Sequence, residues 1–206
     1  GILLMNVVVY GGAFDPLHNG HVDIIHYVLS LNRHDRLCLV PTGIPVYKDR
    51  MFFSADARCK MLQVMFGDDP MIDILDVEIQ KAQPSYTIDT LSFLFGQYGA
   101  TSVTLVVGFD QLFQFHRWRQ FDKILSQCQL LVIPRDGIDH EKLMQAFPEE
   151  LVPYQDVIHY HDVLPTNISS SRIRMMLQRD ESIDDVVPDK IIPIIREHGG
   201  DESAWH

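Results

Sequence analysis

The stretch Tyr10–His21, YGGAFDPLHNGH, follows a short apolar run and holds two glycines, an Asp-Pro turn and two histidines. Glycine lets a ligand approach the backbone closely. His18 and His21 are three residues apart near an expected helix start, so they share one helix face at the positive end of its dipole. Taken alone, a His-x-x-His pair could also be a helix cap or lie on the protein surface. A metal site is the other alternative, but no third ligand is evident. With the glycines before it, the pair favours phosphate binding.

Short β-branched runs alternate with segments of helical periodicity along the rest of the chain. The runs predict strands at Met5–Tyr10, Arg36–Pro41, Met71–Asp76, Ser102–Gly108, Gln129–Pro134 and Asp156–Tyr160. Helices are predicted at Asn19–Leu31, Ser54–Phe66, Thr87–Gln97, Trp118–Leu125, Ile168–Gln178 and Pro188–His198. Strands that are apolar throughout indicate a parallel sheet covered on both faces. We therefore predict a doubly wound, Rossmann-like α/β fold with helices on both faces, a small C-terminal helical cap and ligands at the carboxyl ends of the strands.

The length and the apolar fraction predict one domain. The chain has 206 residues, of which 46% are hydrophobic, enough to bury one sizeable core. We place this single domain at residues 5–198, with 199–206 as a tail. Gly1 to Leu4 precede an internal Met5, so we expect them to be a cloning remnant or a misassigned start.

The charge and the cysteines narrow the class of protein. There are 28 acidic and 17 basic residues, for a formal net charge of −11, which argues against nucleic-acid binding because that relies on clustered Lys and Arg. Cys38, Cys59 and Cys128 are far apart and indicate reduced, buried thiols. No apolar run approaches the roughly 18 to 20 residues of a membrane span, and signal-peptide features are absent. We expect a cytoplasmic protein with no membrane partner.

A second anion site is indicated by Asn167–Leu177, NISSSRIRMML. Its serines are typical helix caps, and Arg172 and Arg174 follow in the first turn, where the helix dipole disfavours cations. Hydroxyls, free N–H groups and a guanidinium at one helix start suit a bound anion. The alternative is an ordinary serine cap with surface arginines. A redox dinucleotide site is opposed by the missing G-x-G-x-x-G spacing after the first strand.

These motifs carry a family resemblance. GGAFDPLHNGH resembles the (T/H)xGH signature of the nucleotidyltransferase superfamily, and ISSSRIR looks like its second signature. Within it, PSYTIDTL (Pro84–Leu91) and VVGFDQLFQFHRW (Val106–Trp118) resemble the bacterial nicotinate-mononucleotide adenylyltransferase family. The similarity extends from about Asn6 to His198. It implies synthesis of deamido-NAD from ATP and nicotinate mononucleotide, a step of NAD biosynthesis.

The resemblance also implies the site residues. It makes His18, His21 and Arg174 the catalytic contacts to the phosphates. For ATP it implies the binding residues Gly11, Gly12, Ala13, Phe14, Gly108, Asp110, Ile168, Ser170 and Ser171. For the nicotinate substrate it implies Lys48, Tyr86, Thr87, Trp118 and Arg135.

Their roles follow from the same resemblance. Asp110 binds nucleotide hydroxyls, and Lys48 and Arg135 contact phosphates. Thr87 starts a helix whose N-terminus binds the nicotinate carboxylate, and the pyridine ring stacks on the flat face of Trp118. Ala13 departs from the family, where a threonine is usual. Tyr47 stands where the family usually has a histidine, and Phe109 fills a position that is commonly small or polar.

The expected reaction needs no protein nucleophile and no general base. The second pKa of a phosphate monoester is about 6, so the acceptor is already mainly dianionic at pH 7. His18 and His21, protonated or as neutral N–H donors, would stabilise developing charge together with Mg²⁺, which we expect to be held mainly by the ATP phosphates and by no dedicated protein site. The rival acceptors are nicotinamide mononucleotide and pantetheine phosphate, and a non-catalytic nucleotide sensor is the rival class. The sequence leaves a homo-oligomer open.

Overall fold

The computed structural model describes residues 3–43, 51–135 and 140–198. The chain packs into two compact units. Of the described residues, the first unit holds 3–10, 27–38, 86–135 and 140–164, and the second unit holds 11–26, 39–43, 51–85 and 165–198. None of the described helices is both long and apolar enough to cross a membrane.

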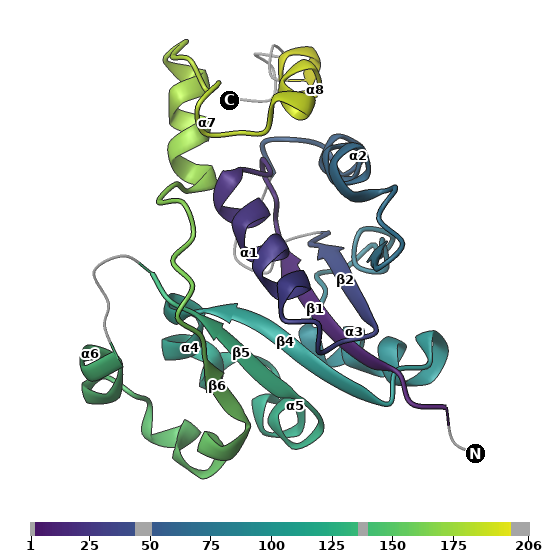
Figure 1. Cartoon of the computed structure of the whole chain (residues 1–206), viewed down its shortest axis with the longest axis vertical. Helices are drawn as coiled ribbons and strands as arrows, with labels where there is room; N and C mark the ends of the chain where they lie inside the picture. The colour runs from purple at the N-terminus through teal and green to yellow at the C-terminus, as the bar shows by residue number, and fades with distance from the viewer. Residues whose placement is uncertain (1–2, 44–50, 136–139, 199–206) are drawn as a thin grey trace. The chain divides into compact units, whose positions relative to one another are not determined.

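Six strands form the sheet, and their order is β3-β2-β1-β4-β5-β6. Their bounds are β1 Asn6–Gly12, β2 Arg36–Pro41, β3 Ile72–Ile74, β4 Ser102–Gly108, β5 Gln129–Ile133 and β6 Ile158–Tyr160. The pairs β1–β4, β4–β5 and β5–β6 are parallel, and β4, β5 and β6 run side by side in Figure 1. This order reverses between β1 and β4, as in doubly wound α/β proteins. The predicted fold class is confirmed.

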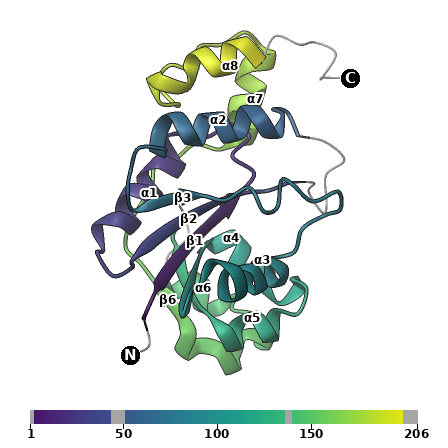
Figure 2. The same ribbon diagram turned by 90° about the vertical axis from the view of Figure 1, so that its right-hand side faces the viewer.

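The first unit carries four described helices. They are α3 Thr87–Phe93, α4 Phe109–Gln114, α5 Phe121–Gln127 and α6 His140–Gln145. The unit's core is made by strand residues that are almost fully buried, such as Val7, Val103 and Leu130. Helix α3 packs against α5, and both lie together in Figure 2.

The second unit carries α2 Ala55–Phe66, α7 Ser170–Gln178 and α8 Ile192–His198, and α1 Asn19–Ser30 begins in it. Helix α2 starts at a serine cap, because the Ser54 side chain accepts from the Ala57 N–H. Its apolar face, including Met61 and Leu62, is fully buried, and α8 packs beside it (Figure 2). The C-terminal helices predicted from the sequence are therefore present.

Most predicted helices and strands agree with the observed ones within a few residues. One predicted site residue, Trp118, lies in a different local structure from the one predicted. The prediction placed Trp118 at the start of a helix, whereas α5 begins at Phe121. Trp118 follows a 3-10 turn at Phe115–Arg117, to which its N–H is hydrogen-bonded at 3.0 Å. Gln120 has a left-handed φ of 53°, which breaks the helical path between that turn and α5. Helices α4 and α6 and the 3-10 segment Glu149–Val157 were not predicted.

Candidate functional site

The two histidines of the opening motif form a reciprocal pair at the start of α1. The His18 N–H donates to His21 Nδ1 at 3.1 Å, and the His21 N–H donates to His18 Nδ1 at 3.2 Å. Their rings stack with centroids 3.6 Å apart and planes 18° from parallel. A capping box has the same pattern, in which the cap residue and the third helical residue satisfy each other's backbone N–H. The two imidazoles thus cap the helix and hold each other in place.

This pairing determines the protonation of both rings. Because each Nδ1 accepts a hydrogen bond, a neutral imidazole here carries its proton on Nε2. Burial lowers the pKa of His18 to about 4, although Asp23 acts in the opposite direction. Burial also lowers the pKa of His21 well below its usual value, and His18 adds to that effect. Of the two forms that the sequence left open, the structure favours neutral N–H donors.

Gly20, between the two histidines, is packed too tightly for a side chain. A Cβ there would lie 2.9 Å from His18 Cε1 and 3.0 Å from the Thr166 carbonyl oxygen. That carbonyl belongs to a segment held to α1, because the Thr166 N–H donates to Asp23 Oδ2 at 2.7 Å. Packing within the protein therefore explains the glycine of the HNGH motif.

The second motif joins the first within the second unit. At the start of α7, the Ser169 side chain accepts from the Arg172 N–H at 3.1 Å. Arg174 donates to the Asp15 carbonyl at 2.9 Å and to Ser171 Oγ at 3.0 Å, and Ser170 Oγ donates to the Pro16 carbonyl at 2.9 Å. The structure thus brings the serine-arginine helix start against the loop that leads to the histidines. Ile168 lies just before this helix, and its N–H donates to Thr166 at 2.9 Å.

The glycine pair ends β1, as expected. A Cβ at Gly11 would lie 3.6 Å from the Val40 carbonyl oxygen, and one at Gly12 would lie 3.5 Å from the Phe14 ring. These are ordinary contacts, so packing inside the protein does not itself require glycine here. Phe14 is 1% exposed and has a left-handed φ of 49°. Its ring meets His21 edge-on at 5.0 Å, so this part of the loop packs on the imidazole pair.

Two residues shape this loop, of which sequence reasoning gave Asp15 only as part of a turn and missed Arg58. The Asp15 carboxylate accepts the N–H groups of Phe52 and Phe53 at 2.9 and 2.7 Å. Arg58 is 2% exposed and donates to the carbonyls of Ala13, Thr42 and Phe53 at 2.6 to 3.2 Å. Its only sequence signal is a charged residue among the buried positions of α2. Arg58 is a positioning residue that fixes the loop beside the glycines.

In the first unit, the acid and the cation predicted for nucleotide contacts lie together. Gly108 ends β4 and its N–H donates to Gln111 Oε1 at 2.9 Å, capping α4. Asp110 lies in the first turn of α4 and forms an exposed ion pair with Arg135, which follows β5. Phe109 is buried, so its bulk points into the protein core and leaves Asp110 exposed.

The residues predicted for the pyridine ring also belong to the first unit. Tyr86 caps α3 and Thr87 is its first residue, as predicted. The Trp118 ring stacks on Phe115 with centroids 4.4 Å apart. The Arg119 guanidinium lies 4.3 Å from the centroid of the Tyr86 ring, a contact that the sequence did not reveal. Trp118 is half-buried, with one face supported by a fully buried phenylalanine.

Two further predictions concern the loop that holds Tyr47 and Lys48 and the expectation of no dedicated metal site. Lys48 and Tyr47 lie outside the described residues. Within residues 3–43, 51–135 and 140–198, no group of three or more His, Cys, Asp and Glu side chains is placed to hold a metal ion.

Comparisons with known proteins agree on one family. The cytidylyltransferase-like family model matches residues 9–192. A Caldicellulosiruptor bescii protein named "Probable nicotinate-nucleotide adenylyltransferase" is 31% identical, covering 95% of this chain and 98% of its own. A Clostridium acetobutylicum protein with the same name is 31% identical over 92% of this chain and 96% of its own. In fold, the chain resembles a Plasmodium falciparum nicotinic acid mononucleotide adenylyltransferase complexed with NaAD, with a TM-score of 0.70, 19% identity and coverage of 94% and 95%.

Proposed function

The chain belongs to the nicotinate-nucleotide adenylyltransferase family, and we propose that it transfers the adenylyl group of ATP to nicotinate mononucleotide. The products are deamido-NAD and pyrophosphate. The observation that carries this proposal is the reciprocal hydrogen bonding of His18 and His21, which aims two neutral N–H donors from one helix start. Such donors suit the oxygens of a polyphosphate.

The reaction is a direct in-line displacement at the α-phosphorus of ATP. A phosphate oxygen of nicotinate mononucleotide forms the new P–O bond, and the bond to the β,γ-pyrophosphate breaks. No proton has to be removed from the attacking phosphate, because it is largely dianionic at pH 7. The protein therefore acts by positioning two anions and by stabilising charge in the transition state.

The second unit supplies most of the phosphate contacts in this proposal. His18 and His21 donate through Nε2 to oxygens of the reacting and leaving phosphates. Arg174 adds a positive charge, and its hydrogen bonds to Asp15 and Ser171 hold the guanidinium beside the loop. At Gly11 and Gly12 the fold itself leaves room for a methyl group, so the missing side chains give the nucleotide access to the backbone. The other contacts proposed for ATP in this unit are Ala13, Phe14, Ile168, Ser170 and Ser171.

The first unit supplies the contacts to the nucleoside and the pyridine ring. Gly108 and Asp110 bind the hydroxyls of ATP, and Arg135 leaves its partner Asp110 to meet a phosphate. Phe115 covers one face of the Trp118 ring, and the pyridine ring stacks on the opposite face of Trp118. Tyr86 and Thr87 bind the carboxylate at the start of α3. Lys48 remains a proposed phosphate contact on sequence grounds alone.

The remaining properties of the enzyme are proposed on coarser grounds. Mg²⁺ bound through the ATP phosphates would shield the charge of the leaving pyrophosphate. We propose residues 5–198 as one catalytic domain and the cytoplasm as its location. We propose that it has no nucleic-acid or membrane partner, and we leave a homo-oligomer as an alternative to a monomer.

Pyrophosphate release with purified protein, ATP and each acceptor tests the proposal. Replacing His18 with Ala should lower the rate constant about 10²- to 10³-fold, the effect typical of losing a transition-state donor. His198→Ala, at the exposed end of α8, should leave it unchanged. Preference for nicotinamide mononucleotide or pantetheine phosphate would overturn the choice of acceptor. ATP binding without turnover of any acceptor would identify a nucleotide sensor instead.

A further inference from the structure

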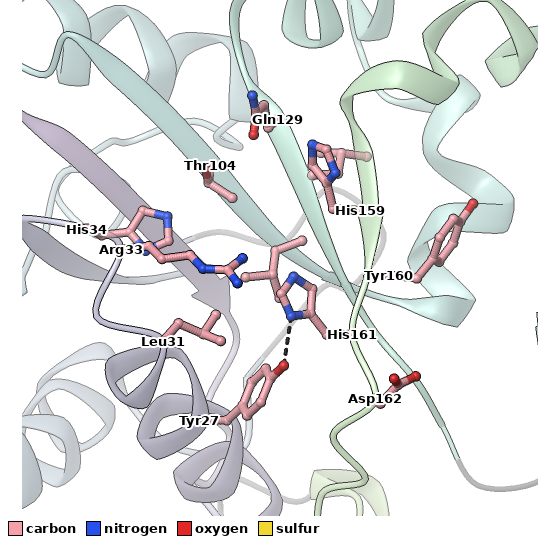
Figure 3. A pocket seen from close by; sticks show the side chains of 12 residues that line it. Tyr27, Leu31, Arg33, His34, Thr104, Gln129, His159, Tyr160, His161 and Asp162 are labelled. Carbon is pink, nitrogen blue, oxygen red and sulfur yellow. Dashed lines mark hydrogen bonds between the residues drawn. The ribbon is translucent and has the colours of Figure 1, made fainter.

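A pocket lies on one face of β4, β5 and β6 in the first unit, and none of its lining residues belongs to the proposed active site. In the register of these strands Thr104 pairs with Gln129, and Leu131 pairs with His159. These residues and His161 line a cavity of about 480 Å³. Figure 3 shows it closed on the other side by the end of α1 and the residues after it, including Tyr27 and Arg33. Cavities of this size accommodate small-molecule ligands.

The pocket gathers four basic side chains although the protein is acidic overall. Arg33, His34, His159 and His161 all line it, and Figure 3 shows the Arg33 guanidinium extending between His34 and His161. Burial lowers the pKa of His34, and the charges of Arg33 and His161 lower it further. Burial lowers the pKa of His161 as well, and Arg33 and His159 add to that effect. The four side chains are therefore close enough to repel one another when charged.

Two acids act on this cluster, and one of them, Asp162, also lines the pocket. Asp35 acts on His34 and Asp162 acts on His161, each raising a pKa as a weaker effect than burial. The Asp35 carboxylate accepts the Asn6 N–H at 2.7 Å, and Asp162 is exposed. Tyr160 also lines the pocket and its pKa is raised by burial, so it stays a neutral phenol.

One polar feature of the cluster points to a ligand, and a second one fixes the orientation of a ring. His34 Nδ1 is buried and, in the part of the chain that the structure describes, has no hydrogen-bond partner, which is costly without a ligand or water. His161 Nδ1 is fixed by Tyr27 Oη at 2.8 Å, so its ring is held in one orientation. Among the described residues, no group of three or more His, Cys, Asp and Glu side chains is placed here to hold a metal ion.

We propose that this pocket binds a small molecule with a doubly charged anionic head group, a phosphate monoester being the chemistry that fits best. Arg33 meets the head group with a charge, the imidazoles donate hydrogen bonds to it, and Thr104 and Gln129 bind hydroxyls of the attached organic part. The anion stabilises the protonated imidazoles, so binding takes up protons and tightens as the pH falls. A site of this kind would be a second ligand site of the enzyme, separate from catalysis.

The test follows the histidine side-chain signals of the full chain by ¹⁵N NMR, during titration with sulfate and with ribose 5-phosphate. Sulfate keeps its two charges at every pH used. Signals of His34, His159 and His161 should shift saturably. If binding raises one imidazole pKa by about one unit, the affinity for sulfate should be severalfold greater near pH 6 than near pH 8, with about tenfold as the upper limit. Because the signals report the pocket itself, the result is independent of whether the proposed reaction occurs.

The variants make the assignment specific. Arg33→Gln and His161→Gln should weaken binding at least severalfold, whereas Lys123→Gln, which removes an exposed cation of the same unit, should not. Tighter binding of ribose 5-phosphate than of sulfate would identify an organic phosphate as the ligand class, and equal binding would restrict recognition to the head group. Absence of saturable shifts at these three histidines with either probe would overturn the proposal. Unchanged binding in Arg33→Gln would do the same.

Discussion

Replacing Gly20 with Ala should disable the histidine pair while leaving the protein folded. The new Cβ would lie 2.9 Å from His18 Cε1 and 3.0 Å from both His18 Nδ1 and the Thr166 carbonyl oxygen. Carbon atoms pack best about 3.5 to 4.0 Å apart, so the first of these contacts is short by about 0.6 Å. The Thr166 carbonyl cannot yield easily, because the adjoining N–H is bonded to Asp23. The imidazole of His18 must therefore move.

This movement breaks the reciprocal hydrogen bonds that orient both rings. Since a misplacement of about 1 Å at a reacting centre can cost about 10²-fold in rate, we expect kcat/KM to fall roughly 10- to 100-fold. The free energy of unfolding should fall by at most about 3 kcal/mol, against the roughly 5 to 15 kcal/mol typical of a folded domain. The overpacking costs about 1 to 3 kcal/mol, and the better helix propensity of Ala returns up to about 1 kcal/mol. Activity thus falls much further than a partial loss of folded protein would explain.

The assay is pyrophosphate release at saturating and limiting ATP, paired with urea unfolding of the same preparation. Gly96→Ala is the matched control, because nothing lies within 4 Å of a Cβ at Gly96. This control should keep wild-type kcat/KM. A Gly20→Ala protein with unchanged kcat/KM would refute the reasoning, since His18 could then be displaced without effect on catalysis.

Three other predictions concern stability and selectivity. Arg58→Leu should lower the free energy of unfolding by about 3 kcal/mol because it leaves buried carbonyls unpaired. Urea titration measures this free energy. The control Lys60→Leu, on the exposed face of α2, should have little effect. Burial lowers the pKa of His18 from 6.5 to about 4, so the unfolded state binds the extra proton as the pH falls. The free energy of unfolding should therefore drop by about 2 kcal/mol from pH 7 to pH 5 for this residue alone, and a stability that rises over this range would contradict the lowered pKa. Arg119→Ala removes the cation–π contact with Tyr86, which is worth about 0.5 to 1 kcal/mol. Because Tyr86 is a proposed substrate contact, the KM for nicotinate mononucleotide should rise about two- to fivefold, and kcat should change less. An unchanged KM would exclude a role of Arg119 in positioning Tyr86.

The sheet could be predicted because its strands have a simple sequence pattern. The bounds of β2 and β4 agree fully with the apolar runs at Arg36–Pro41 and Ser102–Gly108. Strand β3 is only Ile72–Ile74, although the apolar run around it is longer. A three-residue strand is decided by its pairing partner rather than by local propensity, and a single sequence does not contain that information.

The short helices were missed for a related reason. Helix α4 has six residues, and its capping contact comes from Gln111 to the Gly108 N–H, a pattern that includes none of the usual Ser, Thr, Asp or Asn caps. Helix α6 is equally short. Elements of this length show less than two turns of periodicity, so the pattern that identifies longer helices has too few repeats to be recognised.

The candidate site was predictable to the extent that its residues are close in sequence. His18 and His21, and the serines with Arg174, are each one helical turn apart, so spacing alone brings them together. The contact between these two motifs depends on tertiary structure and came only from the family resemblance. Arg58 gave no such signal, because a buried arginine that binds only backbone carbonyls is not distinguished by sequence from a surface one.

The neutral state of the histidines is consistent with a protein whose net charge is −11. Charged imidazoles at His18 and His21 would have to be desolvated in the free enzyme, and for His18 this effect outweighs Asp23 and a backbone hydrogen bond, which both raise its pKa. Neutral rings avoid that cost and still direct Nε2–H dipoles that are already oriented by the backbone. Preorganised dipoles need no rearrangement when charge develops on the phosphates, and they act strongly where water is excluded. The attraction for ATP can then rest on Arg174 and on fixed donors, and the histidines need not titrate during the reaction.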